Sequence, residues 1–169
     1  MKWTTIVSIL LLTSFANGQE PVSPPARTNA TIGGKKLTIA YSSPSIRGRK
    51  IMGGLVPYGR WWRTGADNAT TMQTEADLDL GGLKVPKGTY TLYTLPGATE
   101  WQLIVNKQTG QWGTEYNQQQ DLGRVKMNLA QTPAIVNSLK IELLPTSGNK
   151  GLLKMAWERT EVSVPFVVQ

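Results

Sequence analysis

Apolar side chains occur at every second position in six segments of this sequence. The segments are residues 37–41, 101–105, 125–129, 139–143, 153–157 and 162–166. Successive side chains of a β-strand point to opposite faces, so each segment predicts a strand with one buried face. Turn signals rich in glycine and proline lie between the segments, for example at residues 33–34, 86–88 and 145–148.

A sheet with one apolar face must bury that face against another layer. The sequence therefore predicts an all-β, antiparallel sandwich of two sheets with a jelly-roll-like arrangement. We expect little helix, because only residues 115–123 (EYNQQQDLG) favour a helical turn. No internal repeat indicates a second domain.

One connection, residues 42–65, is much longer than the others. Irregular connections of more than about 12 to 15 residues are uncommon in compact domains and are usually functional or disordered. Apolar side chains such as Ile51, Val56 and Tyr58 argue against disorder, because they would pack. We expect an ordered loop, and it carries five cations: Arg47, Arg49, Lys50, Arg60 and Arg63.

Residues 1–18 are typical of a signal peptide. Lys2 gives a positive start, residues 6–13 are apolar, and residues 16–18 (ANG) form a small-x-small cleavage site. We expect cleavage near Gly18-Gln19 and a periplasmic or secreted protein. We expect no transmembrane segment in the mature chain, because the apolar run is shorter than the roughly 20 residues that cross a bilayer. The proline-rich residues 19–29 predict a tether, followed by a single domain over residues 30–169.

The sequence contains no histidine and no cysteine. Ser-His-Asp and Cys-His catalytic arrangements, the usual zinc sites and disulfides are therefore excluded. We expect no cofactor and no metal site, and the composition disfavours an enzyme without deciding the question. Asp67, Glu115 and Asp121 are weak acid-base candidates, since nothing in their spacing pairs them and solvated surface carboxylates are the alternative.

The formal net charge of +7 suits an anionic partner. Anionic glycans, acidic membrane surfaces and nucleic acids all fit this charge. The export signal makes nucleic acid the least suitable, and we expect none. The oligomeric state does not follow from the sequence.

The stretch GRWWRTG (59–65) concentrates large side chains on the long loop. If it is extended, Trp61 and Arg63 project to one side, and Arg60, Trp62 and Thr64 to the other. Either one tryptophan fills the core while the other rests on the loop, or an outward indole and a guanidinium form a recognition surface. Such a surface would stack on a sugar face and bind a carboxylate, sulfate or phosphate.

Trp112, in the glycine-flanked segment KQTGQWGTEY (107–116), offers a second platform of this kind. Trp101 and Trp157 lie on alternating segments and are expected in the core.

Four stretches carry a family resemblance. They are YSSPSIRGRKIMGGLVPYGRWWRTGADNATT, LKVPKGTYTLYTLPG, EWQLIVNKQTGQWGTEYNQQQDLGRV and MAWERTEVSVPF. Over about residues 22–168 the chain resembles an exported bacterial family classed as domain of unknown function 2911. The resemblance implies a secreted or periplasmic protein and brings no established activity.

The family pattern reads Trp-Arg-Thr-Gly-Ala-Asn-Glu where this chain has residues 62–68. Residues 62–66 match it, whereas Asp67 and Asn68 depart from it, which puts a catalytic carboxylate at position 67 in doubt. The resemblance implies that Trp62 and Gly65 are structural anchors, with Trp62 and Thr64 facing inward and Arg63 outward.

These observations favour a non-catalytic binding module for an anionic or carbohydrate ligand of the cell envelope. The expected ligand-binding residues are Arg63, Trp61, Arg60, Trp112, Arg47 and Arg49. One alternative is a carboxylate-dependent enzyme acting on glycans, whose acidic groups must converge in a cleft. Another is an accessory envelope protein that docks on a partner through an exposed apolar patch around Leu55, Val56 and Tyr58.

Overall fold

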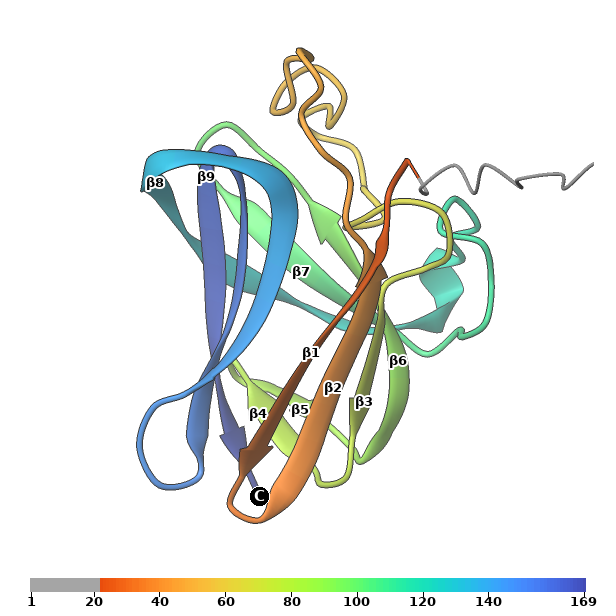
Figure 1. Ribbon diagram of the computed structural model, residues 1–169. Coiled ribbons are helices and arrows are strands. Elements are labelled where there is room, and N and C mark those ends of the chain that lie inside the picture. The colour runs from red at the N-terminus through yellow and green to blue at the C-terminus, as the bar shows by residue number, and fades with distance from the viewer. Residues whose placement is uncertain (1–21) are drawn as a thin grey trace, which may run out of the picture.

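The computed structural model describes residues 22–169, so the expected signal peptide and the first residues of the expected tether lie outside the described chain (Figure 1). Nine strands form one antiparallel sheet in the order β1-β2-β3-β6-β7-β8-β9-β4-β5. They are β1 (Pro25–Ile32), β2 (Lys35–Ser42), β3 (Thr71–Thr74), β4 (Leu78–Leu80), β5 (Leu83–Val85), β6 (Gly88–Leu95), β7 (Trp101–Asn106), β8 (Asp121–Pro145) and β9 (Lys150–Val168).

Alternation in the sequence identifies strands correctly. All six alternating segments lie within strands, and the all-β, antiparallel prediction is confirmed. The one short helix in residues 22–169, η1 (Gln118–Gln120), falls inside the stretch 115–123 that favours a helical turn. No helix in this part of the chain is long and apolar enough to cross a membrane.

The expected division into two separate sheets is not confirmed, because β8 is continuous. Its first residues pair with β7, and from Asn128 onward it pairs with β9. Its register against β9 shifts between Gln131 and Val136 and again between Val136 and Lys140, and Figure 1 shows β8 curving there. Alternation predicts which face of a segment is buried, but not whether two segments belong to one bent strand.

The bent sheet brings its β1–β2 edge back against β8 around a core. The N–H of Leu143 donates to Thr28 Oγ1 at 3.3 Å, which links β8 to β1, and the N–H of Ile141 donates to the Tyr41 hydroxyl on β2 at 3.0 Å. The largest fully buried side chains between these strands include Trp157, Phe166, Leu37, Ile39 and Leu103. Burying each such side chain stabilises the fold by about 1.5 to 3 kcal/mol.

The tether prediction is wrong for residues 25–29. These residues form the first part of β1 and pair with β2, from Pro25 opposite Ser42 to Asn29 opposite Thr38. β1 is the last strand at one edge of the sheet, where proline is tolerated at the start of a strand because its missing N–H is not needed by a neighbour. A proline-rich composition therefore does not distinguish a linker from an edge strand.

Candidate functional site

The long connection between β2 and β3 is ordered and runs over one end of the sheet (Figure 1). Trp62 attaches this connection to β6 through two backbone hydrogen bonds. The backbone N–H of Trp62 donates to the Thr94 carbonyl at 2.7 Å, and the Trp62 carbonyl accepts from the backbone N–H of Thr94 at 3.0 Å. Two residues of this loop, Ile51 and Val56, have fully buried side chains. The Glu158 carboxylate on β9 accepts long hydrogen bonds from the backbone at residues 51 and 52, at 3.4 and 3.3 Å.

A second loop, between β7 and β8, joins the first. Asn68 and Trp112 form an isolated antiparallel bridge, and the N–H of Gly113 donates to the Asp67 carbonyl at 2.9 Å. A Cβ at position 113 would lie 2.6 Å from this carbonyl oxygen and 2.8 Å from Cδ of Arg63. The close approach of the two loops therefore requires glycine at position 113.

The loops enclose an open pocket of about 660 Å³, which we call the arginine pocket. Three tryptophans, three arginines and one carboxylate line it: Trp61, Trp62, Trp157, Arg49, Arg60, Arg63 and Asp67. The other lining residues are Val22, Ser23, Pro44, Leu55, Pro57, Gly65, Ala66 and Thr114. Pockets of a few hundred cubic ångströms that combine apolar walls with a few polar groups are typical of small-molecule sites.

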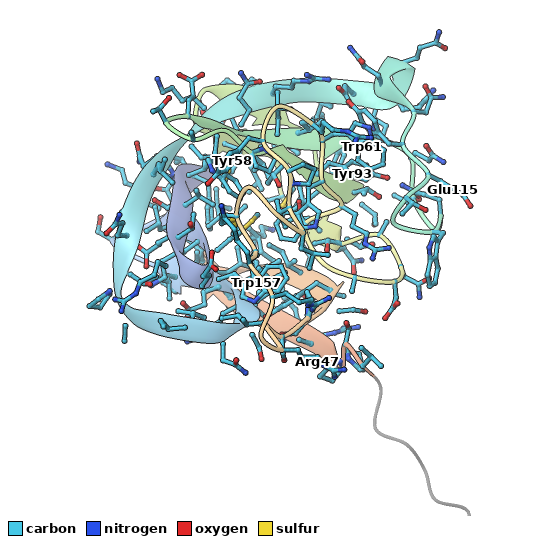
Figure 2. All side chains as sticks on the ribbon, turned by 90° about the horizontal axis from the view of Figure 1, so that it is seen from above. Arg47, Tyr58, Trp61, Tyr93, Glu115 and Trp157 are labelled. Carbon is cyan, nitrogen blue, oxygen red and sulfur yellow. The ribbon has the colours of Figure 1, made fainter. Side chains whose placement is uncertain are left out.

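The tryptophans build the floor and one wall of the pocket. Trp157 is only 1% exposed, and Trp62 stacks on it with ring centroids 5.9 Å apart and 19° between the planes. Trp62 also packs edge-on against Trp101 at 6.5 Å, which places it between the core and the pocket. Trp61 is 38% exposed and leans edge-on against Tyr93 at 5.5 Å, beside which it lies in Figure 2.

Residues 60–63 all line the pocket, so they do not divide between two opposite faces as an extended segment would. The backbone that follows them is irregular as well. Thr64 has φ of 56°, in the left-handed region that β-branched residues rarely adopt, and Asp67 has φ of 55°. These two positions turn the chain back across the end of the sheet.

The strained backbone at Thr64 is fixed by its surroundings. The Thr64 side chain is fully buried, its hydroxyl bonds to Thr94 Oγ1 at 3.1 Å, and its carbonyl accepts from the Thr70 hydroxyl at 2.8 Å. A Cβ at Gly65 would lie only 2.9 Å from Thr70 Oγ1. Each such left-handed residue costs on the order of 1 to 3 kcal/mol, and it persists only where the rest of the structure holds it. The pocket wall is therefore preorganised.

The arginines of the pocket have few protein partners. Arg63 Nε donates to the Gly65 carbonyl at 3.3 Å, and Arg49 donates to the carbonyls of Ser45 and Ile46. Arg60 makes no hydrogen bond or ion pair within residues 22–169. The ion pairs of the described chain involve other cations, namely Lys84, Arg124, Lys126, Lys140 and Lys154. Three arginines thus line a pocket in which Asp67 is the one carboxylate.

Two expected ligand-binding residues lie outside this pocket. Arg47 is exposed and donates to the Val22 carbonyl at 2.8 Å, near the point where the described chain begins (Figure 2). Trp112 is 47% exposed, forms the backbone bridge to Asn68 and does not line the pocket. The sequence groups these residues with Arg49 and Trp61 because they share the same loops, but the backbone separates them.

The three acidic candidates do not converge in the pocket. Asp121 Oδ2 accepts from the Tyr116 hydroxyl at 2.8 Å and pairs with Arg124 at 3.0 Å, so it stabilises the start of β8. Glu115 lies toward the outer edge of the molecule in Figure 2 and does not line the pocket. Only Asp67 does, so the pocket lacks the pair of carboxylates that glycoside hydrolysis requires.

Trp61 packs against two tyrosines, Tyr93 and Tyr116. Tyr93 and Tyr116 pack edge-on at 4.8 Å, and Tyr116 contacts Trp61 at 4.9 Å. Burial, followed by the hydrogen bond that the phenol donates to Asp121, raises the pKa of Tyr116 to about 12. Burial also raises the pKa of Tyr93, whose hydroxyl donates to the Glu115 carbonyl. Both phenols are neutral at physiological pH and act as rigid supports.

The carboxylates of Asp77 and Asp79 stabilise turns. Asp79 accepts from the N–H of Gly82 and pairs with Lys84, and Asp77 accepts from the N–H of Lys87. Within residues 22–169, no three acidic side chains are grouped so that they could hold a metal ion.

Sequence reasoning misses two contributions to the site. It places Trp157 only in the core, because an alternating segment does not reveal that one edge of the indole reaches a pocket. It places Val22 and Ser23 in the tether, yet they line the pocket as well. Of the expected apolar patch, Leu55 and Tyr58 are exposed, whereas Val56 is fully buried.

Comparison with known proteins identifies the family but no activity. No curated protein and no solved structure matches the chain. A family model described as "protein of unknown function (DUF2911)" matches residues 23–166, which include every lining residue of the arginine pocket except Val22. The chain therefore belongs to this family.

Proposed function

We propose that this protein is an exported binding module whose arginine pocket takes an acidic sugar or another small anion that carries hydroxyl groups. The observation that carries the proposal is the set of three arginines, Arg49, Arg60 and Arg63, which line the pocket and form no ion pair with any residue that the structure describes. Arg63 is partly buried, whereas Arg49 and Arg60 are exposed, and a guanidinium forms strong, bidentate hydrogen bonds with an anionic group that a ligand can supply.

The walls of the pocket favour a ligand with an apolar face. Trp61 presents a half-exposed indole, and Trp62 stacked on Trp157 presents a second. An indole packs well against the C–H face of a pyranose, while a guanidinium binds a carboxylate, sulfate or phosphate in a bidentate manner. Asp67 supplies an acceptor for ligand hydroxyl groups. A sugar that bears an acidic group combines all three features.

Several features favour binding over catalysis. Asp67 is the one carboxylate on the pocket lining, and the sequence has no histidine or cysteine. The pocket wall is held in place by strained residues and by the contact at Gly113, as expected for a preformed site. The signal-like residues 1–18 make polysaccharides of the cell envelope the first ligands to test.

Tryptophan fluorescence tests this proposal, because three indoles line the pocket. We expect galacturonate, glucuronate and sulfated sugars to change the emission, and neutral sugars to act far more weakly. Hydrogen bonds to charged groups contribute about 1.5 to 3 kcal/mol, so Arg60→Ala and Arg63→Ala should each weaken binding by about tenfold or more.

Arg159→Ala is the matched control. Arg159 is exposed, donates to the Pro133 carbonyl and does not line the pocket, so its removal should leave the affinity unchanged. Equal affinity for neutral and acidic sugars, or equal losses in all three variants, would refute the proposal.

A further inference from the structure

A second pocket of about 370 Å³ lies beside the arginine pocket, and we call it the β1 pocket. Residues of β1 and β2 line it together with residues that precede and begin β3: Pro25, Ala26, Arg27, Ala40, Tyr41, Ser42, Asn68, Ala69 and Thr71. Several of these side chains are polar, and none is acidic. The β1 pocket therefore offers hydrogen-bonding groups and one positive charge.

Two chain segments contribute lining residues to both pockets. In the first segment, Val22 and Ser23 line the arginine pocket, and residues 25–27 line the β1 pocket. In the second, residues 65–67 line the arginine pocket, and residues 68–69 line the β1 pocket. The N–H of Ala66 donates to the Ser42 carbonyl at 3.3 Å, which joins the two linings directly.

Both pockets are lined by positively charged arginine side chains. Arg27 is exposed and makes no hydrogen bond or ion pair with any residue that the structure describes. With Arg27, four arginines line the two pockets against the single carboxylate of Asp67. One monovalent anion engages one or two guanidinium groups in a bidentate manner, so it would leave the others without a counter-charge.

We propose that the ligand is a linear acidic oligosaccharide that spans both pockets, with one acidic residue in the arginine pocket and a following residue in the β1 pocket. This inference rests on the proposed function and adds a second subsite to it. Arg27 holds the second acidic group, and Asn68 and Thr71 bond to hydroxyl groups of that sugar. A repeating anion matches cations that are spread over two neighbouring pockets.

Chain length tests the inference. Galacturonate and its oligomers up to the hexamer are titrated against the protein while tryptophan fluorescence is followed. We expect affinity to rise by about tenfold or more from the monomer to the longer oligomers, because the second subsite adds a charged contact. Arg27→Ala should remove most of this gain and leave the affinity for the monomer unchanged, whereas Arg63→Ala should weaken binding at every length.

Lys35→Ala is the matched control, because Lys35 is an exposed cation at the far end of the same β1–β2 hairpin. It should leave affinity unchanged at every length. Arg27 and Lys35 are both exposed, and equal melting temperatures of the two variants would establish that both fold.

The outcomes separate the two proposals. If the monomer binds but affinity does not rise with length, or if Arg27→Ala acts equally at all lengths, the second subsite is refuted and the arginine pocket stands. If no length binds, both proposals fail. If a single-stranded oligonucleotide of equal charge binds as tightly and depends equally on Arg27, the site selects polyanions in general, and the assignment to a glycan is overturned.

Discussion

The contact between the two loops at Gly113 gives a prediction that does not depend on the identity of the ligand. In Gly113→Ala, the new Cβ would lie 2.6 Å from the Asp67 carbonyl oxygen and 2.8 Å from Cδ of Arg63. Contacts of Cβ below 3.0 Å essentially do not occur in proteins, so the loops must separate by roughly 0.4 Å or more. The φ angle of Gly113 is not in the left-handed region, so the cost is steric and does not arise from backbone conformation.

The magnitude follows from two effects. Overpacking of a tight contact costs about 1 to 3 kcal/mol. The hydrogen bond from the Gly113 N–H to the same carbonyl, now 2.9 Å, would lengthen, and its loss costs about 1 kcal/mol. We expect the free energy of unfolding to fall by about 2 to 4 kcal/mol, which lowers the melting temperature by on the order of 10 °C in a domain of this size.

Urea denaturation measures this change, and Gly110→Ala is the comparison. Gly110 has φ of 82°, and a methyl group there would meet no heavy atom within 4 Å, so alanine costs about 1 to 2 kcal/mol of backbone strain without moving the pocket. Gly113→Ala should therefore also weaken ligand binding, and Gly110→Ala should not. A free energy of unfolding for Gly113→Ala within about 0.5 kcal/mol of the unmodified protein would refute the reasoning.

Two further predictions concern aromatic residues. Trp157→Ala should lower the free energy of unfolding by about 3 to 5 kcal/mol, because its indole is buried and stacked against Trp62. Trp112→Ala should change the free energy of unfolding by less than about 1 kcal/mol, because Trp112 is exposed. Similar losses for the two variants in urea denaturation would contradict this prediction. Tyr116 should ionise near pH 12 in an ultraviolet titration. Because its folded pKa is raised, the stability that it contributes is present below about pH 10 and is lost as the pH rises through 12. Asp121→Asn should lower this pKa, since the carboxylate accepts the phenolic hydrogen bond; an unchanged titration would contradict the assignment.

The sequence predicts strands where one face is buried and the other is exposed, and it fails where this condition does not hold. Leu37 and Ile39 are buried while Lys36, Thr38 and Ala40 are more exposed, so this part of β2 alternates clearly. In β6, residues 90–94 are all buried, because the core covers one face and the two loops cover the other. Alternation disappears there, although β6 is the strand to which Trp62 attaches.

The composition of the long loop indicates a site, but not its lining. Arg47 and Arg49 are two residues apart, and only Arg49 lines the arginine pocket. The left-handed conformation of Arg47 changes the direction of the chain between their side chains. A left-handed conformation at arginine or threonine, as at Arg47 and Thr64, has no sequence signal, whereas aspartate, as at position 67, adopts it more often than most residues. Whether a side chain lines the pocket or lies on the open surface is therefore decided by backbone angles that the residue types do not reveal.

The bend in β8 has a consequence for how this chain tolerates changes in length. From Gln131 to Lys140, β8 contains more residues than the stretch of β9 from Thr160 to Ala156 opposite it. In a regular ladder, one inserted residue moves every following side chain to the opposite face. At this corner the extra residues already lie outside the regular pairing, so an insertion there changes the curvature of the strand and leaves both flanking ladders in register. This corner is where homologous chains can differ in length without exposing the core.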